Sequence, residues 1–207
     1  FYIFFFFFVF AGVYSLDSDG AKDLQKKCSP RIRVVQMDVT KPEQIESVVE
    51  QVRESKLPLW AVVNNAGILI GAPFEWGEDI EVMEKTFQVN VYGLVRVTKA
   101  FINLLRQSKG RVVNVASGAG RVTIKNLSYY SMSKHAVRAF SDGIRRELVR
   151  FGVKVITIEP TFYKTPILDF VQIGKTNRFY FERSLPETQK YYSENYPERF
   201  RTSSKKF

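Results

Sequence analysis

Tyr130 and Lys134 are the pair of side chains in this sequence that is best suited to proton transfer. They stand four residues apart in a stretch of helical periodicity, so both project from one face of the expected helix. A phenol, with a pKa of about 10, is a poor base at neutral pH, but a neighbouring ammonium favours the phenolate and lowers that pKa. We therefore predict that Tyr130 exchanges a proton with a hydroxyl or carbonyl group.

Ser117 and His135 are further polar residues near this pair. Ser117 ends an expected strand thirteen residues before Tyr130, and its hydroxyl is suited to hold the same oxygen atom. Proton exchange at a carbinol also needs a hydride acceptor. His135 projects about 100° away from Lys134 around the helix, so we expect a structural role for it. Taken alone, Tyr130 and Lys134 would more often be an exposed surface pair on a helix, and Ser117 would more often be a strand-end cap.

Strands and helices are expected to alternate along the chain. We expect strands at 32–35, 59–63, 111–116 and 153–158, and helices at 40–52, 80–105 and 129–150. The residues from Thr40 to Glu43 resemble a capping box that opens the first helix. The alternation is typical of parallel β-α-β units and indicates an α/β fold, with an open sheet covered by helices on both faces.

Asp38, Asn64, Ser117 and Pro160 each stand directly after an expected strand. Ligands of open parallel sheets bind beyond the carboxyl ends of the strands, so these residues mark the expected site. After Pro160 the pattern weakens, and residues 175–207 show no clear strand, as in a lid or substrate loop.

The bulk composition is that of one globular domain. The chain has 207 residues, of which 45% are hydrophobic and 25% charged. The net charge is +10, but the Lys and Arg residues are scattered along the chain and mixed with Asp and Glu. This distribution favours a basic solvated surface over a nucleic-acid site. Cys28 is the single cysteine, so the sequence offers no internal disulfide and no cysteine-based zinc site, and a reducing compartment fits. We expect no metal site.

Three motifs in order carry a family resemblance. They are Asn64-Asn65-Ala66-Gly67 after a strand, Ser117 after the next strand, and Tyr130-Ser131-Met132-Ser133-Lys134 on the following helix. The Tyr-Lys spacing alone occurs by chance, but the ordered set resembles the short-chain dehydrogenase/reductase family. The segments 59–67, 110–121 and 158–166 are most similar to its animal retinol and 17β-hydroxysteroid dehydrogenase branch.

The resemblance implies a Rossmann-like, doubly wound parallel sheet and roles for individual residues. Ser117 would position the substrate oxygen, Tyr130 would pass the proton, Lys134 would lower its pKa and hold the nicotinamide ribose, and Asn90 would support a water-mediated proton relay to Lys134. The remaining cofactor contacts that it implies are Asp38 and Val39 at the adenine, Asn64, Ala66 and Gly67 in the strand-end motif, and Pro160 and Thr165 near the nicotinamide. Asp38 could equally cap the helix that follows it.

Two departures from the family pattern stand out. No glycine-rich phosphate loop precedes Asp38, so the first strand-turn-helix unit is missing or degenerate. The usual Pro-Gly after the last strand is Pro160-Thr161 here. Residues 10–15 resemble the family's second strand, and no basic residue follows them before Lys22. NADP needs a basic group there for its ribose phosphate, so NAD is the expected cofactor.

We expect three regions: an aberrant Phe-rich segment at 1–8, an incomplete dinucleotide-binding catalytic domain at 9–170, and a truncated substrate-loop region at 171–207. The resemblance implies a lipophilic retinoid or steroid substrate and peripheral association with the endoplasmic reticulum membrane, with the cytoplasm as the alternative. Assembly into a homo-oligomer is left open. The rival interpretation is a non-catalytic binding or scaffold protein that kept the fold without a phosphate loop.

Overall fold

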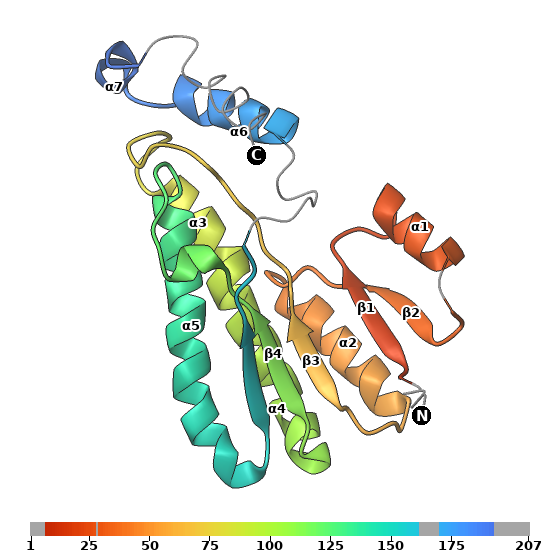
Figure 1. Cartoon of the computed structure of the whole chain (residues 1–207). Coiled ribbons are helices and arrows are strands. Elements are labelled where there is room, and N and C mark those ends of the chain that lie inside the picture. The colour runs from red at the N-terminus through yellow and green to blue at the C-terminus, as the bar shows by residue number, and fades with distance from the viewer. Residues whose placement is uncertain (1–6, 28, 162–169, 193–207) are drawn as a thin grey trace.

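The structure, a computed structural model, describes residues 7–27, 29–161 and 170–192 (Figure 1). Strands and helices alternate through most of this part of the chain, as the periodicity predicts. The strands are β1 (Val9–Val13), β2 (Ile32–Gln36), β3 (Ala61–Asn64), β4 (Arg111–Val115) and β5 (Lys154–Ile158). The helices are α1 (Asp19–Lys27), α2 (Pro42–Glu54), α3 (Glu81–Phe87), α4 (Leu94–Ser108), α5 (Ser128–Leu148), α6 (Phe170–Glu182) and α7 (Pro186–Lys190).

All strand pairs are parallel, but the described strands form two sheets. β1 pairs with β2, and β3, β4 and β5 form the second sheet in that order. In Figure 1, β2 lies on the side of β1 away from β3. The chain therefore steps outward from β1 to β2, returns through α2 to β3, and continues in the opposite direction. This reversal confirms the doubly wound α/β architecture, and ligands of such folds bind at the reversal.

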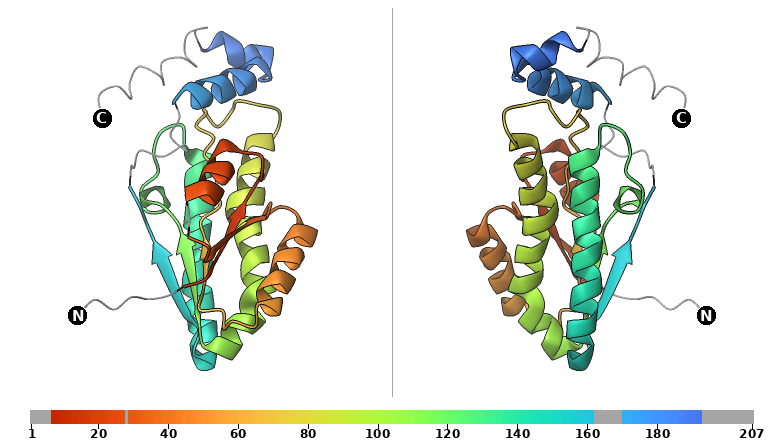
Figure 2. Two further views of the ribbon diagram at one scale, coloured as in Figure 1. Left: turned by 90° about the vertical axis from the view of Figure 1, so that its right-hand side faces the viewer. Right: turned by 90° about the vertical axis from the view of Figure 1, so that its left-hand side faces the viewer.

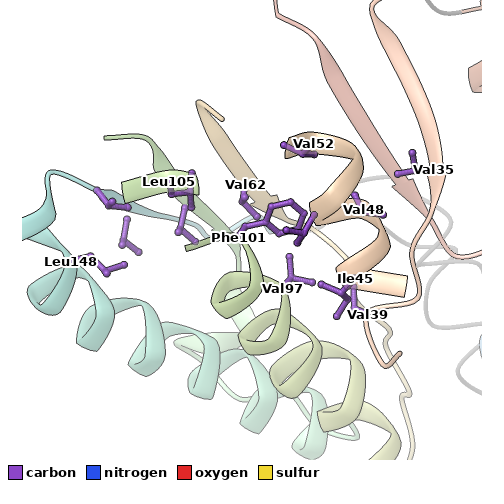
Figure 3. Packing of buried hydrophobic residues seen from close by; sticks show 14 residues of the cluster. Val35, Val39, Ile45, Val48, Val52, Val62, Val97, Phe101, Leu105 and Leu148 are labelled. Atoms are coloured by element: carbon purple, nitrogen blue, oxygen red, sulfur yellow. The ribbon is translucent and has the colours of Figure 1, made fainter. Parts of the chain in front are cut away.

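The helices α2, α4 and α5 cover one face of the sheets, and α1 lies on the other (Figure 2). Side chains of the central strands that face α2, α4 and α5 are buried, among them Val62, Val112 and Val155. They pack against Phe101 and Leu105 of α4 in the main hydrophobic core (Figure 3). This core fixes the strand ends on which the polar residues of the site stand.

The opposite face of β3–β5 departs from the expected two-sided cover. Val63, Ile156 and Ile158 point away from the core and are 59%, 39% and 46% exposed. Right-handed crossovers place the helices that connect β2 through β5 on one side, because the strand order advances in one direction from β3 to β5. Among the described residues, no helix covers the other face at these positions.

Two helix boundaries differ from expectation. The capping box at Thr40 is wrong: α2 begins at Pro42, and Lys41 at its N-cap makes no side-chain cap bond. Proline is favoured in the first helical turn because its missing N–H is not needed there. The helix expected at 80–105 is α3 and α4 joined by a π-helical turn, Gln88–Gly93. Such turns interrupt helices at functional sites, and this one carries Asn90.

None of the helices in the described residues has the length and apolar character needed to span a membrane.

Candidate active site

Tyr130 and Lys134 lie together in the first turns of α5, as the four-residue spacing predicts. The Lys134 Nζ is 5.7 Å from the centre of the Tyr130 ring. Both side chains are nearly buried, at 8% and 5% exposure. Two ionisable groups that are buried side by side near the carboxyl ends of parallel strands form the centre of the candidate site.

The ammonium group of Lys134 is held by the backbone of β4. Its Nζ donates a hydrogen bond of 2.9 Å to the carbonyl oxygen of Val115. Burial lowers the pKa of Lys134 from 10.5 to about 8, because desolvation disfavours the charged form. The ammonium is therefore fixed in position, and it releases its proton more readily than an ordinary lysine does.

Ser117 stands just after β4, where it caps the short helical turn Gly118–Gly120. Its Oγ accepts a hydrogen bond of 3.1 Å from the Ala119 N–H. Burial raises the pKa of Tyr130, and a hydrogen bond with Ser117 opposes this effect. A lowering of the tyrosine pKa by Lys134 stays a prediction, and the Lys134 ammonium donates its hydrogen bond to the Val115 carbonyl.

Asn90 fastens the loop after β3 to the helix layer. Its Oδ1 accepts from the Ile68 N–H at 2.8 Å, and its Nδ2 donates to the Ile68 carbonyl at 2.9 Å and to Ser133 Oγ at 3.1 Å. The buried amide is therefore fully used in these contacts. A proton relay from Asn90 to Lys134 stays a prediction.

Gly67 lies directly in front of Asn90 and Lys134. A methyl group built at Gly67 would be 3.4 Å from Asn90 Oδ1 and 3.6 Å from Lys134 Nζ. The missing side chain keeps the approach to the Lys134 ammonium open. Ala66 precedes it as an exposed residue, so the Ala66-Gly67 backbone is accessible to a bound cofactor.

Asn64 makes contacts within the protein. Its Nδ2 donates to Thr98 Oγ1 at 2.9 Å and to Asn114 Oδ1 at 2.8 Å, and Asn114 Nδ2 donates to Ser141 Oγ at 2.8 Å. This buried chain of side chains joins β3, β4, α4 and α5 beneath the site. Sequence reasoning missed Asn114, although a polar residue within a strongly apolar strand is a signal for it. The cofactor contact of Asn64 stays a prediction.

Asp38 and Val39 are placed by local contacts. Asp38 Oδ1 accepts from the Thr40 N–H at 2.9 Å and from the Thr40 hydroxyl at 2.8 Å. Val39 is buried against Gly93, where a methyl group would lie 2.5 Å from Val39 Cγ2. These bonds account for Asp38 structurally, and its adenine contact stays a prediction.

The last two expected cofactor contacts follow β5. The Pro160 carbonyl accepts a hydrogen bond of 2.9 Å from the Gly118 N–H, which ties it to the turn after Ser117. Thr165 lies outside the described residues. His135 is exposed, and its Nδ1 lies 2.9 Å from the Ser131 carbonyl oxygen, in line with a structural role. In the described ranges, His, Cys, Asp and Glu form no cluster that could hold a metal ion.

The chain is similar to dehydrogenases over nearly its whole length. It is 45% identical over 195 residues to estradiol 17-beta-dehydrogenase 2 of Mus musculus, covering 92% of this chain and 51% of that protein. It is 40% identical over 185 residues to retinol dehydrogenase 16 of Rattus norvegicus, covering 87% of this chain and 57% of that one. The chain thus spans about half the length of the relatives it matches.

Solved structures of the same fold match as well. A short chain dehydrogenase from Burkholderia cenocepacia in complex with NADP has a TM-score of 0.68 and 27% identity, covering 78% of this chain and 64% of that one. A short-chain dehydrogenase from Streptomyces avermitilis has a TM-score of 0.69 and 30% identity, covering 77% and 59%. The family profile described as short chain dehydrogenase matches residues 11–175. The chain therefore belongs to the short-chain dehydrogenase family, in agreement with its ordered motifs.

Proposed function

We propose that the protein oxidises a secondary or allylic alcohol, or reduces the matching carbonyl compound, with NAD(H). One arrangement at the carboxyl end of β4 supports this proposal. The Tyr130 hydroxyl is hydrogen-bonded to Ser117, and the buried Lys134 beside Tyr130 is held by the Val115 carbonyl. These three groups can hold an oxygen atom and exchange its proton, which is the protein's part of hydride-transfer chemistry.

The residues divide this work as follows. Ser117 hydrogen-bonds the substrate oxygen, and Tyr130 gives or takes its proton. When bound, the nicotinamide ring supplies the hydride acceptor for oxidation and the hydride donor for reduction. Because burial keeps Tyr130 in its protonated form, the free site is prepared to donate a proton to a carbonyl. Oxidation needs the phenolate, so its rate should rise with pH.

The described residues fit one half of the nicotinamide cofactor. The open approach at Gly67 leads to the Lys134 ammonium, which would hold the nicotinamide ribose. Ala66 and Pro160 would complete that half, together with Thr165, which lies outside the described residues. At the other end, Asp38 and Val39 remain candidates for the adenine contact. Asn64 remains a candidate cofactor contact in the strand-end motif. No basic residue lies between β1 and Lys22, so we favour NAD over NADP.

A lipophilic substrate is the second part of the proposal. The matched relatives are an estradiol and a retinol dehydrogenase by name, and both names denote apolar alcohols. Such a substrate partitions into lipid, which supports peripheral association with the endoplasmic reticulum membrane. Cytoplasmic residence is the alternative, and homo-oligomer formation stays open.

A non-catalytic scaffold is the second candidate function. The described residues before Asp38 contain no glycine-rich turn that would hold a pyrophosphate at a helix N-terminus, so cofactor binding is the property that distinguishes this candidate from the enzyme. Titration of the full-length protein with NADH separates the two candidates. An NADH fluorescence that increases saturably on binding, together with alcohol-dependent formation of NADH, supports the enzyme. Absence of both supports the scaffold.

A further inference from the structure

Helix α6 packs across the loop that leads from the active site to α3. The Gly77 N–H donates to the Tyr180 carbonyl at 3.1 Å and to Ser184 Oγ at 3.0 Å. The ring of Phe181 lies 5.1 Å from the ring of Trp76. Tyr180, Phe181 and Ser184 therefore define the face of this segment that contacts the loop at residues 68–80.

Asn177 lies on the same face of α6, three residues before Tyr180 and seven before Ser184. Its side chain is 0% exposed. Both Nδ2 and Oδ1 are buried without a hydrogen-bond partner, and within the described residues no other side chain has two such atoms. Buried polar groups are nearly always paired, so an amide that lacks every partner requires an explanation.

A hydrophobic cluster lies against this face of α6, which Tyr180 and Phe181 share with Asn177. The cluster on this side of α6 is formed by Ile70, Ala72, Trp76, Val82 and Tyr180. A buried amide in an apolar cluster is costly in free energy unless a partner arrives. An apolar wall with one or two placed polar groups is typical of sites for lipophilic ligands.

The same loop connects this cluster to the reacting groups. It begins at Ile68, which is held by Asn90 beside Gly67 and Lys134. Figure 1 shows α6 beyond the ends of α3 and α5, on the side of the molecule to which the carboxyl ends of β4 and β5 point. An elongated substrate with its reacting oxygen at Tyr130 would thus extend along the loop toward α6.

We propose that Asn177 binds a second oxygen-bearing group at the far end of an apolar alcohol substrate. A hydroxyl is the best match, because it can accept a hydrogen bond from Nδ2 and donate one to Oδ1. The inference rests on the proposed function and narrows it: estradiol carries a hydroxyl at each end, whereas retinol carries one. The protein should therefore prefer the steroid diol, which enters as α6 separates from the loop.

The test compares estradiol with its analogue that lacks the phenolic hydroxyl, in the full-length protein with NAD. Asn177→Leu keeps the side-chain volume but removes both polar atoms. We expect it to lower kcat/KM for estradiol at least about tenfold and to leave kcat/KM for the analogue unchanged, as for the loss of the two hydrogen bonds to that hydroxyl. Asn103→Leu, at an exposed position of α4, is the matched control and should change neither value.

Equal losses for both substrates, or no loss for either, would overturn the assignment and leave Asn177 with a packing role or an internal water. Equilibrium binding of both compounds to the protein with NADH is measured in parallel. If neither compound is oxidised, the proposed function fails, and a selective loss of estradiol binding in the variant still supports the Asn177 contact. Asn177→Ala replaces the leucine variant if the latter does not fold.

Discussion

The Lys134 ammonium donates a 2.9 Å hydrogen bond to the carbonyl oxygen of Val115. This bond connects α5 to the last residue of β4, two positions before Ser117. The contact sets the distance between the helix that carries Tyr130 and the strand end that carries Ser117. It also leaves the ammonium nearly buried, and this burial lowers the pKa of Lys134 to about 8.

The lowered pKa of Lys134 predicts a stability that rises with pH. Between pH 8 and about 10.5 the unfolded chain still binds a proton that the folded protein has released, so the free energy of unfolding increases with pH. The increase attributable to Lys134 should approach about 1.4 kcal/mol per pH unit within this window. Urea unfolding of the cofactor-free protein from pH 7.5 to 9.5 measures it.

Lys134→Met is the control for that measurement because methionine has a similar length and does not titrate. The stability difference between the variant and the wild type should change across this range. Parallel stability curves would show that the Lys134 pKa is not lowered. The range stops below pH 10 because the raised pKa of Tyr130 acts in the opposite direction above it.

Gly67→Ala should impair cofactor binding without unfolding the protein. The added methyl group would meet Asn90 Oδ1 at 3.4 Å and Lys134 Nζ at 3.6 Å, which are ordinary contacts. It would nevertheless occupy the open approach to Lys134. We expect the NADH dissociation constant to rise about tenfold or more, while the free energy of unfolding changes by less than about 1 kcal/mol. Unchanged NADH affinity would remove Gly67 from the cofactor site.

Gly143→Ala is predicted to stabilise the protein. Gly143 lies in the interior of α5, and a methyl group there meets no heavy atom within 4 Å. Alanine loses less backbone entropy in a helix than glycine, so the gain should be about 0.5–1 kcal/mol. Thermal unfolding checks the gain, and NADH binding should be unchanged. A lower melting temperature would contradict the position of Gly143 on an open helix surface.

Asn114→Leu tests the buried polar chain beneath the site. The variant loses the hydrogen bonds that Asn114 makes with Asn64 and Ser141. We expect a loss of about 1–3 kcal/mol in the free energy of unfolding. The exposed Asn103→Leu should stay within about 0.5 kcal/mol of the wild type. Equal effects of the two substitutions would show that the chain of hydrogen bonds does not stabilise the fold.

Periodicity in the sequence predicted the alternating elements because local patterns determine them. The four-residue spacing placed Tyr130 beside Lys134, and the strand-end position brought Ser117 to Tyr130. These relationships follow from the geometry of a helix and of a parallel sheet. The separation of β1 and β2 from the other strands was not predicted, because strand neighbours depend on contacts distant in sequence.

The chemistry of the site was less accessible from sequence. The Lys134 ammonium is near Tyr130, but its hydrogen bond to the Val115 carbonyl and its burial do not follow from the four-residue spacing. The Asn64 contacts with Thr98 and Asn114 join residues 34 and 50 positions apart. No local pattern encodes such contacts. Pro42, within the apparent capping box, was a local signal that α2 begins there.

Tyr130→Phe is the substitution that tests the central claim most directly, with Tyr129→Phe as the neighbouring control. The variant removes one hydroxyl from the site, whereas the control removes a hydroxyl that donates to the Phe74 carbonyl at 2.6 Å. In the full-length protein with NAD and estradiol, we predict that Tyr130→Phe lowers kcat by at least about a hundredfold with nearly unchanged NADH affinity. Tyr129→Phe should keep kcat within a fewfold of the wild type. Undiminished turnover in Tyr130→Phe would contradict the proposed proton transfer.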